Sequence, residues 1–268
     1  YPAAAIVDFC NFIGITRTNS RHSIEMLESF VRRELNRVAL RRMAVLRPLK
    51  LVLDNWPTDA DGAPVVEWFE VANNPENEAD GTRRVPFTGE LWIEADDFAE
   101  VPPPKFFRLS PPGREVRLRG AFLVTATDVV KDAEGTVVEV HATYDPESKG
   151  GTAPDGRKVK STMHWVSAPP HAQTATVALY DRLFTAEAPG GERTGGEPLD
   201  DLNPDSQEIL TGCRVEPALG GETPPPGAVV QFERLGYFAH DPRTPLLFHR
   251  TVGGLRDEWA AIQKRQGK

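Results

Sequence analysis

The chain has 268 residues, 40% of them hydrophobic and 26% charged, and a formal net charge of −8 at pH 7. This is the composition of an ordinary globular protein, and the length allows two or three small folding units. The sequence has no apolar run of 18 residues and no basic-then-apolar N-terminal segment, so we expect neither a membrane span nor secretion, and a cytoplasmic location.

Two helices are predicted at the N-terminal end. The first begins near Pro2 and ends near Gly14, because proline suits the first helical turn and glycine suits the C-terminal cap. The second begins at residues 20–23, and its apolar residues recur at intervals of three and four. This spacing continues to Pro48, so residues 1–47 are predicted to form a helical segment. The opposite face of the second helix is basic and carries Arg32, Arg33, Arg37 and Arg41.

After Pro48 the apolar residues alternate with polar ones, as they do in strands. Many short strands separated by Gly- and Pro-containing turns indicate a mainly β protein built as a sandwich or a barrel. The predicted strands are residues 49–56, 65–71, 86–93, 115–127, 137–144, 158–166, 174–183, 209–215, 229–237 and 247–252.

The sequence offers little support for catalysis. Its six histidines are scattered without metal-binding spacing, and it contains no phosphate-binding glycine loop and no G-x-S-x-G motif. Cys10 and Cys213 lie far apart and outside any CxxC pattern, which argues against a zinc site and for a reducing compartment. We therefore predict no catalytic residue and no metal ligand in this chain.

Signs of RNA binding are stronger. Between Glu28 and Lys50 there are seven Lys or Arg residues against two acids, although the whole chain is acidic. The segment 105–108, Lys-Phe-Phe-Arg, interleaves aromatic rings with cations, a combination that stacks unpaired bases and neutralises phosphates. Arg117 and Arg119 follow at strand spacing, which puts them on one face. A charged strand face beside core aromatic residues accounts for these patterns equally well.

A series of motifs in fixed order then resembles the glutaminyl-tRNA synthetases, which are class I aminoacyl-tRNA synthetases. The resemblance covers essentially the whole chain and places it in the C-terminal part of such an enzyme. The motifs are residues 42–46 with 48–53, 85–93, 115–119, 143–145, 155–160, 164–167, 179–184, 232–234 with 236–238, and 250–252.

The resemblance implies a particular fold and role. A short helical segment, residues 1–47, would contact the tRNA stem, and residues 48–268 would form two anticodon-binding β-barrels like that of a ribosomal 5S-RNA-binding protein. The proximal barrel would span residues 48–165 and the distal barrel residues 166–240, with the C-terminal strand returning to the proximal barrel. The expected partner is tRNA-Gln, bound through its anticodon loop and inner stem, and not DNA or a membrane. The protein is expected to be a monomer.

The whole enzyme implied by the resemblance joins glutamine to its tRNA through a glutaminyl-adenylate. ATP and Mg²⁺ would bind a preceding catalytic domain that carries the H-I-G-H and K-M-S-K-S signatures, and no cofactor is expected in this segment. The archaeal or eukaryotic type of glutamyl-tRNA synthetase, which has the same barrels, remains an alternative. Two non-enzymatic alternatives are a free-standing RNA-binding barrel and an all-β interaction module without an RNA role.

The resemblance also assigns readers of the anticodon. Arg41 and Gln231 match residues that read the middle base, through donors and acceptors aimed at an unstacked base edge. Arg108 matches the reader of the third base and Arg117 the reader of the first. Arginine suits this task because its guanidinium group presents planar pairs of donors and remains charged.

Five further contacts are carried over in the same way. Arg234 resembles a supporting contact and Asn36 a contact to the anticodon stem-loop. Thr16, Arg17 and Glu25 resemble residues that touch the inner side of the tRNA.

Two positions depart from the family pattern close to these contacts. Leu40 stands where the family usually has proline, so the backbone before Arg41 is less constrained. Phe107 replaces a cation that commonly precedes Arg108.

Overall fold

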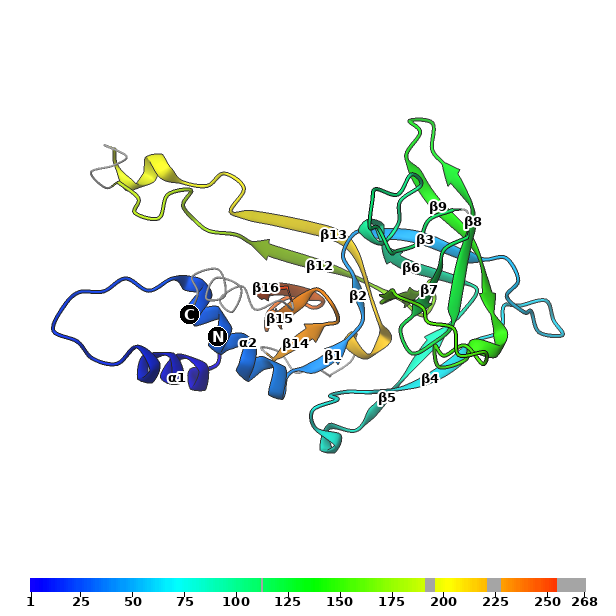
Figure 1. Cartoon of the computed structure of the whole chain (residues 1–268), viewed down its shortest axis with the longest axis horizontal. Coiled ribbons are helices and arrows are strands. Elements are labelled where there is room, and N and C mark those ends of the chain that lie inside the picture. The colour runs from blue at the N-terminus through cyan, green and yellow to red at the C-terminus, as the bar shows by residue number, and fades with distance from the viewer. Residues whose placement is uncertain (112, 191–195, 221–227, 255–268) are drawn as a thin grey trace.

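The two predicted helices are present in a computed structural model, which describes residues 1–111, 113–190, 196–220 and 228–254 (Figure 1). Helix α1 spans Ala3–Ile13 and α2 spans Ile24–Val38. Gly14 follows α1 with φ of 67°, a conformation that glycine adopts readily. The helical pattern predicted beyond Val38 is wrong, because residues 40–45 form two short strands, β1 (Leu40–Arg42) and β2 (Ala44–Val45).

The first large sheet forms a barrel-like body on the right of Figure 1, in the strand order β10-β7-β8-β9-β3-β6-β11. Its core contains a cluster of aromatic side chains in which Phe87 lies 4.8 Å from Trp165 and 5.4 Å from Phe122, measured between ring centroids. A separate hairpin, β4 and β5, packs beside it. The bounds are β3 Pro48–Leu53, β4 Glu67–Ala72, β5 Thr82–Phe87, β6 Glu90–Glu94, β7 Glu115–Leu118, β8 Leu123–Lys131, β9 Val137–Asp145, β10 Thr162–Met163 and β11 Val166–Ser167.

The second sheet has the order β1-β14-β15-β16-β12-β13-β2. It therefore takes strands from before Pro48 as well as from the C-terminal part of the chain. The last strand, β16, pairs with β15 and β12 in this sheet, so the expectation that it returns to the proximal barrel is wrong. Residues 255–268, also assigned to the barrels, lie outside the described residues. The bounds are β12 Gln173–Tyr180, β13 Gln207–Val215, β14 Val229–Phe232, β15 Gly236–His240 and β16 Leu247–Gly253.

Two predicted strands are in fact hairpins. The single strand predicted at residues 115–127 covers β7, a turn and part of β8. The single strand predicted at residues 229–237 covers β14, a turn and the start of β15. Short 3-10 helices complete the fold at Glu78–Asp80 (η1), Ala95–Asp97 (η2), Pro146–Ser148 (η3), Pro198–Asp201 (η4) and Pro217–Leu219 (η5).

Helix α2 packs on the second sheet through its apolar face. Phe30, Val31 and Leu35 are buried against Tyr237 of β15 and Val252 of β16. The C-terminal end of α2 is thereby placed next to β1, which follows it in the chain.

Buried carboxylates connect the second sheet to the rest of the protein. Glu216, 1% exposed, accepts hydrogen bonds from Arg83 Nη2 at 3.0 Å and from the backbone N–H of Met43 at 3.1 Å. The side chain of Arg42 is also buried, with its Nε 3.6 Å from the Glu216 carboxylate. Glu94 of β6 accepts from the backbone N–H of Leu46 at 2.7 Å. Arg83 belongs to the β4–β5 hairpin and Glu94 to the first sheet, so Glu216 ties the second sheet to the hairpin and Glu94 ties the end of β2 to the first sheet.

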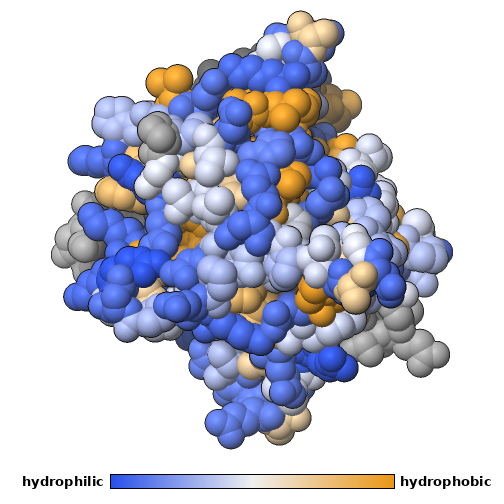
Figure 2. Space-filling view, turned by 90° about the vertical axis from the view of Figure 1, so that its right-hand side faces the viewer, coloured by the Kyte–Doolittle hydropathy of each residue, from blue (hydrophilic) through white to orange (hydrophobic). Residues whose placement is uncertain are grey.

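The surface of the first barrel is mainly hydrophilic on the face shown in Figure 2, with small separate hydrophobic patches. Among the described helices, none is long and apolar enough to cross a bilayer.

The two cysteines lie in opposite environments. Cys10 is exposed on α1, whereas Cys213 is fully buried and donates to the carbonyl of Leu46, with Sγ and O 3.3 Å apart. Burial raises the pKa of the Cys213 thiol to about 11, so it forms little of the reactive thiolate at neutral pH. We expect a thiol reagent to modify one cysteine in the native protein and two in denaturant. Rapid modification of both in the native state would contradict the buried position of Cys213.

Candidate nucleic-acid interface

Three polar side chains stand in a row across the second sheet. Arg41 on β1 is the register partner of Gln231 on the parallel strand β14, and Gln231 is in turn the partner of Tyr237 on β15. Register partners on adjacent strands have their side chains on the same face. The fold thus brings together the two predicted readers of the middle base, Arg41 and Gln231, which are 190 residues apart in the sequence (231 − 41).

Asn36, from the last turn of α2, closes this row through hydrogen bonds. Gln231 Nε2 donates to the Tyr237 hydroxyl at 2.9 Å, and that hydroxyl donates to Asn36 Oδ1 at 3.3 Å. Burial raises the pKa of Tyr237, so its hydroxyl stays protonated and able to donate at neutral pH.

Arg41 binds the end of α2. Its Nη2 donates to Asn36 Oδ1 at 3.0 Å and to the Asn36 carbonyl at 2.7 Å, and its Nη1 donates to the Ala39 carbonyl at 2.5 Å. The last carbonyls of a helix lack partners within the helix, and a cation there also interacts favourably with the helix dipole. Arg41 is consequently only 4% exposed and is held in one position.

These residues line an open pocket of about 570 Å³, within the usual size range of ligand sites. Arg119 also lines it, with its side chain 45% exposed and paired with Glu233. Gln231 is 7% exposed and lines the pocket, and among the described residues its Oε1 has no hydrogen-bond donor, so this atom can accept from a ligand. The other lining residues are Ser29, Arg32, Arg33, Pro75 and Glu76. A pocket with several guanidinium groups and an amide suits a polar, planar and negatively charged ligand such as a nucleotide.

A second group of predicted contacts surrounds Asp97, whose side chain is only 4% exposed. Arg234 Nη1 and Nη2 donate to the two oxygens of this carboxylate at 2.6 and 2.9 Å, and Arg108 Nη1 donates to the same group. Arg234 lies in the β14–β15 turn with φ of 70°, and its Nη1 is 3.1 Å from His164 Nδ1. Asp97 therefore holds Arg108, from the first barrel, and Arg234, from the second sheet, in fixed positions.

Arg117 and Arg119 enter different environments, although strand spacing predicts one shared face. Strand β7 ends at Leu118, so the alternation stops before Arg119. Arg117 Nε donates to the carbonyl of Gly151, and its Nη1 donates to Thr162 Oγ1 at 3.4 Å. Arg119 lies instead in the pocket with Gln231, and nothing in its sequence spacing separates it from Arg117.

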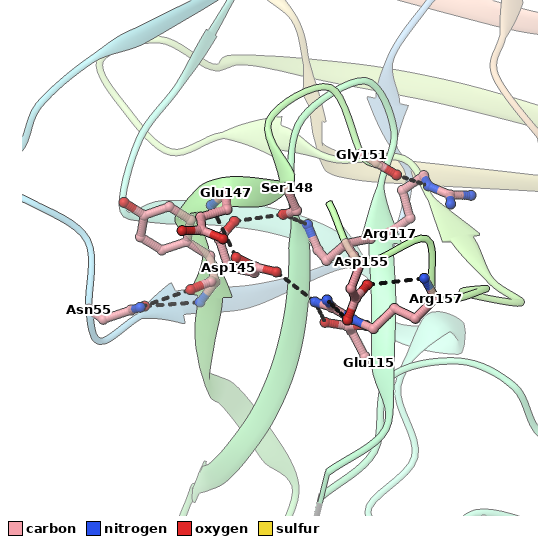
Figure 3. A network of polar contacts seen from close by, with 11 residues as sticks. Asn55, Glu115, Arg117, Asp145, Glu147, Ser148, Gly151, Asp155 and Arg157 are labelled. Carbon is pink, nitrogen blue, oxygen red and sulfur yellow. Dashed lines mark hydrogen bonds and ion pairs between the residues drawn. The ribbon is translucent and has the colours of Figure 1, made fainter. Parts of the chain in front are cut away.

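Arg157 anchors the loop that follows β9, as Figure 3 shows. It donates to both carboxylate oxygens of Glu115 at 2.8 Å, to Asp145 at 2.6 Å and to Asp155 at 3.0 Å. With three carboxylates around it, Arg157 is an internal clamp, and it fixes the start of the basic segment that continues to Lys160.

None of the three predicted contacts to the inner stem lines the pocket. Thr16 and Arg17 are exposed in the connection between the helices, and Thr16 Oγ1 donates to the Thr18 carbonyl at 2.7 Å. Glu25 is at the start of α2, about 16 Å along the helix from Asn36 at 1.5 Å per residue. Its carboxylate accepts from Arg182 at 2.7 Å, so the structure gives it a partner within the chain.

Sequence reasoning named Arg119 only as a basic residue on the face of Arg117, and it missed Tyr237, Asp97 and Glu216 as parts of this arrangement. Asp97 belongs to an acidic segment that resembles a solvated surface, and Glu216 has no motif around it. Within the described ranges, no three His, Cys, Asp or Glu side chains are grouped as metal ligands.

Comparison with known proteins now decides the family. Two family profiles, both described as "tRNA synthetases class I (E and Q), anti-codon binding domain", match residues 39–145 and 162–241. The chain belongs to this family. The family predicted from the sequence is therefore confirmed.

Individual relatives agree with this assignment. The chain is 50% identical to a glutamine–tRNA ligase of Nitrobacter winogradskyi over 264 residues, which are 97% of this chain and 45% of that protein. It is 49% identical to a glutamine–tRNA ligase of Rhodopirellula baltica over 271 residues, 100% of this chain and 43% of that protein. A glutamine–tRNA ligase of Pseudomonas putida is 43% identical over 97% of the chain and 45% of its own length. The chain thus spans less than half the length of these relatives.

Proposed function

We propose that this chain binds the anticodon loop and inner stem of tRNA-Gln, as the recognition part of a glutamine–tRNA ligase. In this proposal the ligase is a cytoplasmic monomer that joins glutamine to its tRNA through a glutaminyl-adenylate. ATP and Mg²⁺ act in the part of the relatives that this chain does not span.

The observation that carries the proposal is the pocket that contains Arg41, Gln231 and Asn36. These residues come from three separate elements, and they line one surface with Arg119. Since the Nη atoms of Arg41 are bound to Asn36 and Ala39, Gln231 presents its open acceptor, Oε1, to the middle base. Arg41 and Asn36 fix the floor of the pocket. Arg108, Arg117 and Arg234 contribute contacts to the neighbouring nucleotides, and Thr16, Arg17 and Glu25 contact the inner stem.

The test compares binding of the chain to tRNA-Gln and to a copy in which only the middle anticodon base is changed. Fluorescence anisotropy at fixed salt should show a preference of about 1–3 kcal/mol, the range for one well-made base contact. In Gln231→Ala the preference should disappear, because the hydrogen-bonding group that faces the base is gone. Affinity must be compared at one salt concentration, since phosphate contacts make it fall steeply as salt rises.

Gln207→Ala is the matched control, because Gln207 is exposed at the start of β13 and lies outside the pocket. It should keep the full preference. Equal binding of both tRNAs by the unaltered chain would refute anticodon reading at this pocket.

A further inference from the structure

Phe107 is an unusual side chain on this surface. Among the phenylalanines, all of which fall in the described ranges, only Phe12 and Phe107 are exposed, and Phe107 is 43% exposed. It lies in the connection between η2 and β7, beside Arg108 in the sequence. A ligand that covers this ring would remove apolar area from water, which is favourable.

Two cations lie over this ring. The Arg114 guanidinium carbon is 5.4 Å and the Lys160 Nζ is 5.0 Å from the ring centroid, both within cation–π range. Although these two charges lie over the ring, Phe107 remains 43% exposed, so part of the ring is accessible to a ligand.

Both cations are positioned and free of carboxylate partners. Arg114 Nη1 donates to the carbonyl of Phe106, and Lys160 follows the loop that Arg157 anchors (Figure 3). Unlike Arg157, neither Arg114 nor Lys160 forms an ion pair with any residue in the described part of the chain. Their charges are thus available to an anionic ligand.

Phe107 lines two pockets, and Lys160 lines both of them with it. The first pocket also contains Lys105, Arg108 and Thr162, and the second contains Arg114 and Lys158. An aromatic ring shared by two cation-lined pockets is the arrangement that binds single-stranded nucleic acid, with a base on the ring and phosphates on the cations.

We propose that Phe107 is a stacking platform for an unpaired base of the anticodon loop, and that Arg114 and Lys160 bind the phosphates on either side of that base. This inference rests on the proposed function, because it takes the ligand to be the same RNA. It adds a contact that depends on the planarity of the base and not on its hydrogen-bonding edge.

The experiment uses the whole chain and a set of tRNA-Gln anticodon stem-loops. In each RNA one unpaired loop base is replaced by an abasic site. The protein variants are Phe107→Leu, which removes the ring, and Phe107→Tyr, which keeps it. Phe107→Leu should weaken binding of the intact loop about 5- to 150-fold, and Phe107→Tyr should bind as the unaltered chain does.

The decisive result is a coupling between one protein position and one RNA position. For the unaltered chain, one abasic site should weaken binding about as much as Phe107→Leu does with the intact loop. For Phe107→Leu, the same abasic site should cause no further loss of affinity. Trp68→Leu is the matched control. Trp68 is 45% exposed and has the Arg84 guanidinium carbon 4.9 Å from its ring centroid, but it lies outside these pockets. It should bind every RNA as the unaltered chain does.

Unchanged binding by Phe107→Leu, or a loss that adds equally to every abasic site, would overturn the platform. If the unaltered chain still prefers the correct middle base in that case, the proposed function stands and only the platform fails. If the unaltered chain binds none of the stem-loops and shows no preference between tRNAs, both proposals fail.

Discussion

Replacing Glu216 by glutamine is expected to lower the free energy of unfolding by about 3–5 kcal/mol, the cost of breaking a buried ion pair. The carboxylate is 1% exposed, and it is close to the guanidinium groups of Arg83 and Arg42, whose side chains are 7% and 3% exposed. Burial lowers the pKa of Arg42 to about 10, so it remains charged at neutral pH and would lack its counter-charge in the variant. Urea denaturation followed by circular dichroism measures the loss.

Glu208→Gln is the control for this variant. Glu208 also pairs with an arginine, Arg47, at 2.7 Å, but the two side chains are 51% and 46% exposed. Exposed pairs of this kind contribute about 0–1 kcal/mol, so the control should unfold near the wild-type urea midpoint. If Glu216→Gln did the same, the buried carboxylate would not be what joins the second sheet to the β4–β5 hairpin.

Asp97→Asn is expected to destabilise the protein by about 3 kcal/mol and to weaken tRNA binding at the same time. The figure is at the lower end for broken buried pairs, because the Arg108 side chain is 37% exposed and water can solvate it. Binding weakens because Arg108 and Arg234 lose the carboxylate that holds them in position. Urea denaturation and anisotropy on the same preparations test the two effects.

The neighbouring Asp96 supplies the matched control. It is exposed in the same 3-10 helix, so Asp96→Asn changes net charge equally without touching the arginines. We expect it to retain wild-type stability and to bind tRNA at least as tightly. An Asp97→Asn protein with unaltered tRNA affinity would show that the positions of Arg108 and Arg234 do not matter for binding.

The helices and most strands could be predicted from local periodicity, and the errors have physical causes. Residues 40–45 have apolar spacing that resembles a helix, yet their backbone pairs with β14 and β13, which follow much later in the chain. The turn between β14 and β15 contains no proline, glycine or asparagine, and Arg234 itself takes the positive φ. Neither feature leaves a signal in a short window of sequence.

The site was predictable in part, through family resemblance. Arg41, Gln231 and Asn36 come together as one surface, but local spacing could not show this, because their contact depends on sheet register. Arg117 and Arg119 could not be separated, because the end of β7 decides which of them faces the pocket. Buried partners such as Asp97 were missed because an isolated acidic residue looks the same in sequence whether it is solvated or paired.

The order of strands in the second sheet has a consequence for synthesis on the ribosome. All strands of the first sheet lie between Pro48 and Ser167, so that body is an insertion that can fold while the second sheet is still incomplete. The 190 residues from Arg41 to Gln231 (231 − 41) take roughly 10–40 s to translate. During that interval β1 has no partner strand, and β2 has none until β13 follows. The ribosome therefore makes α2 and β1 early, but their side of the pocket is completed only when β14 and β15 have been made.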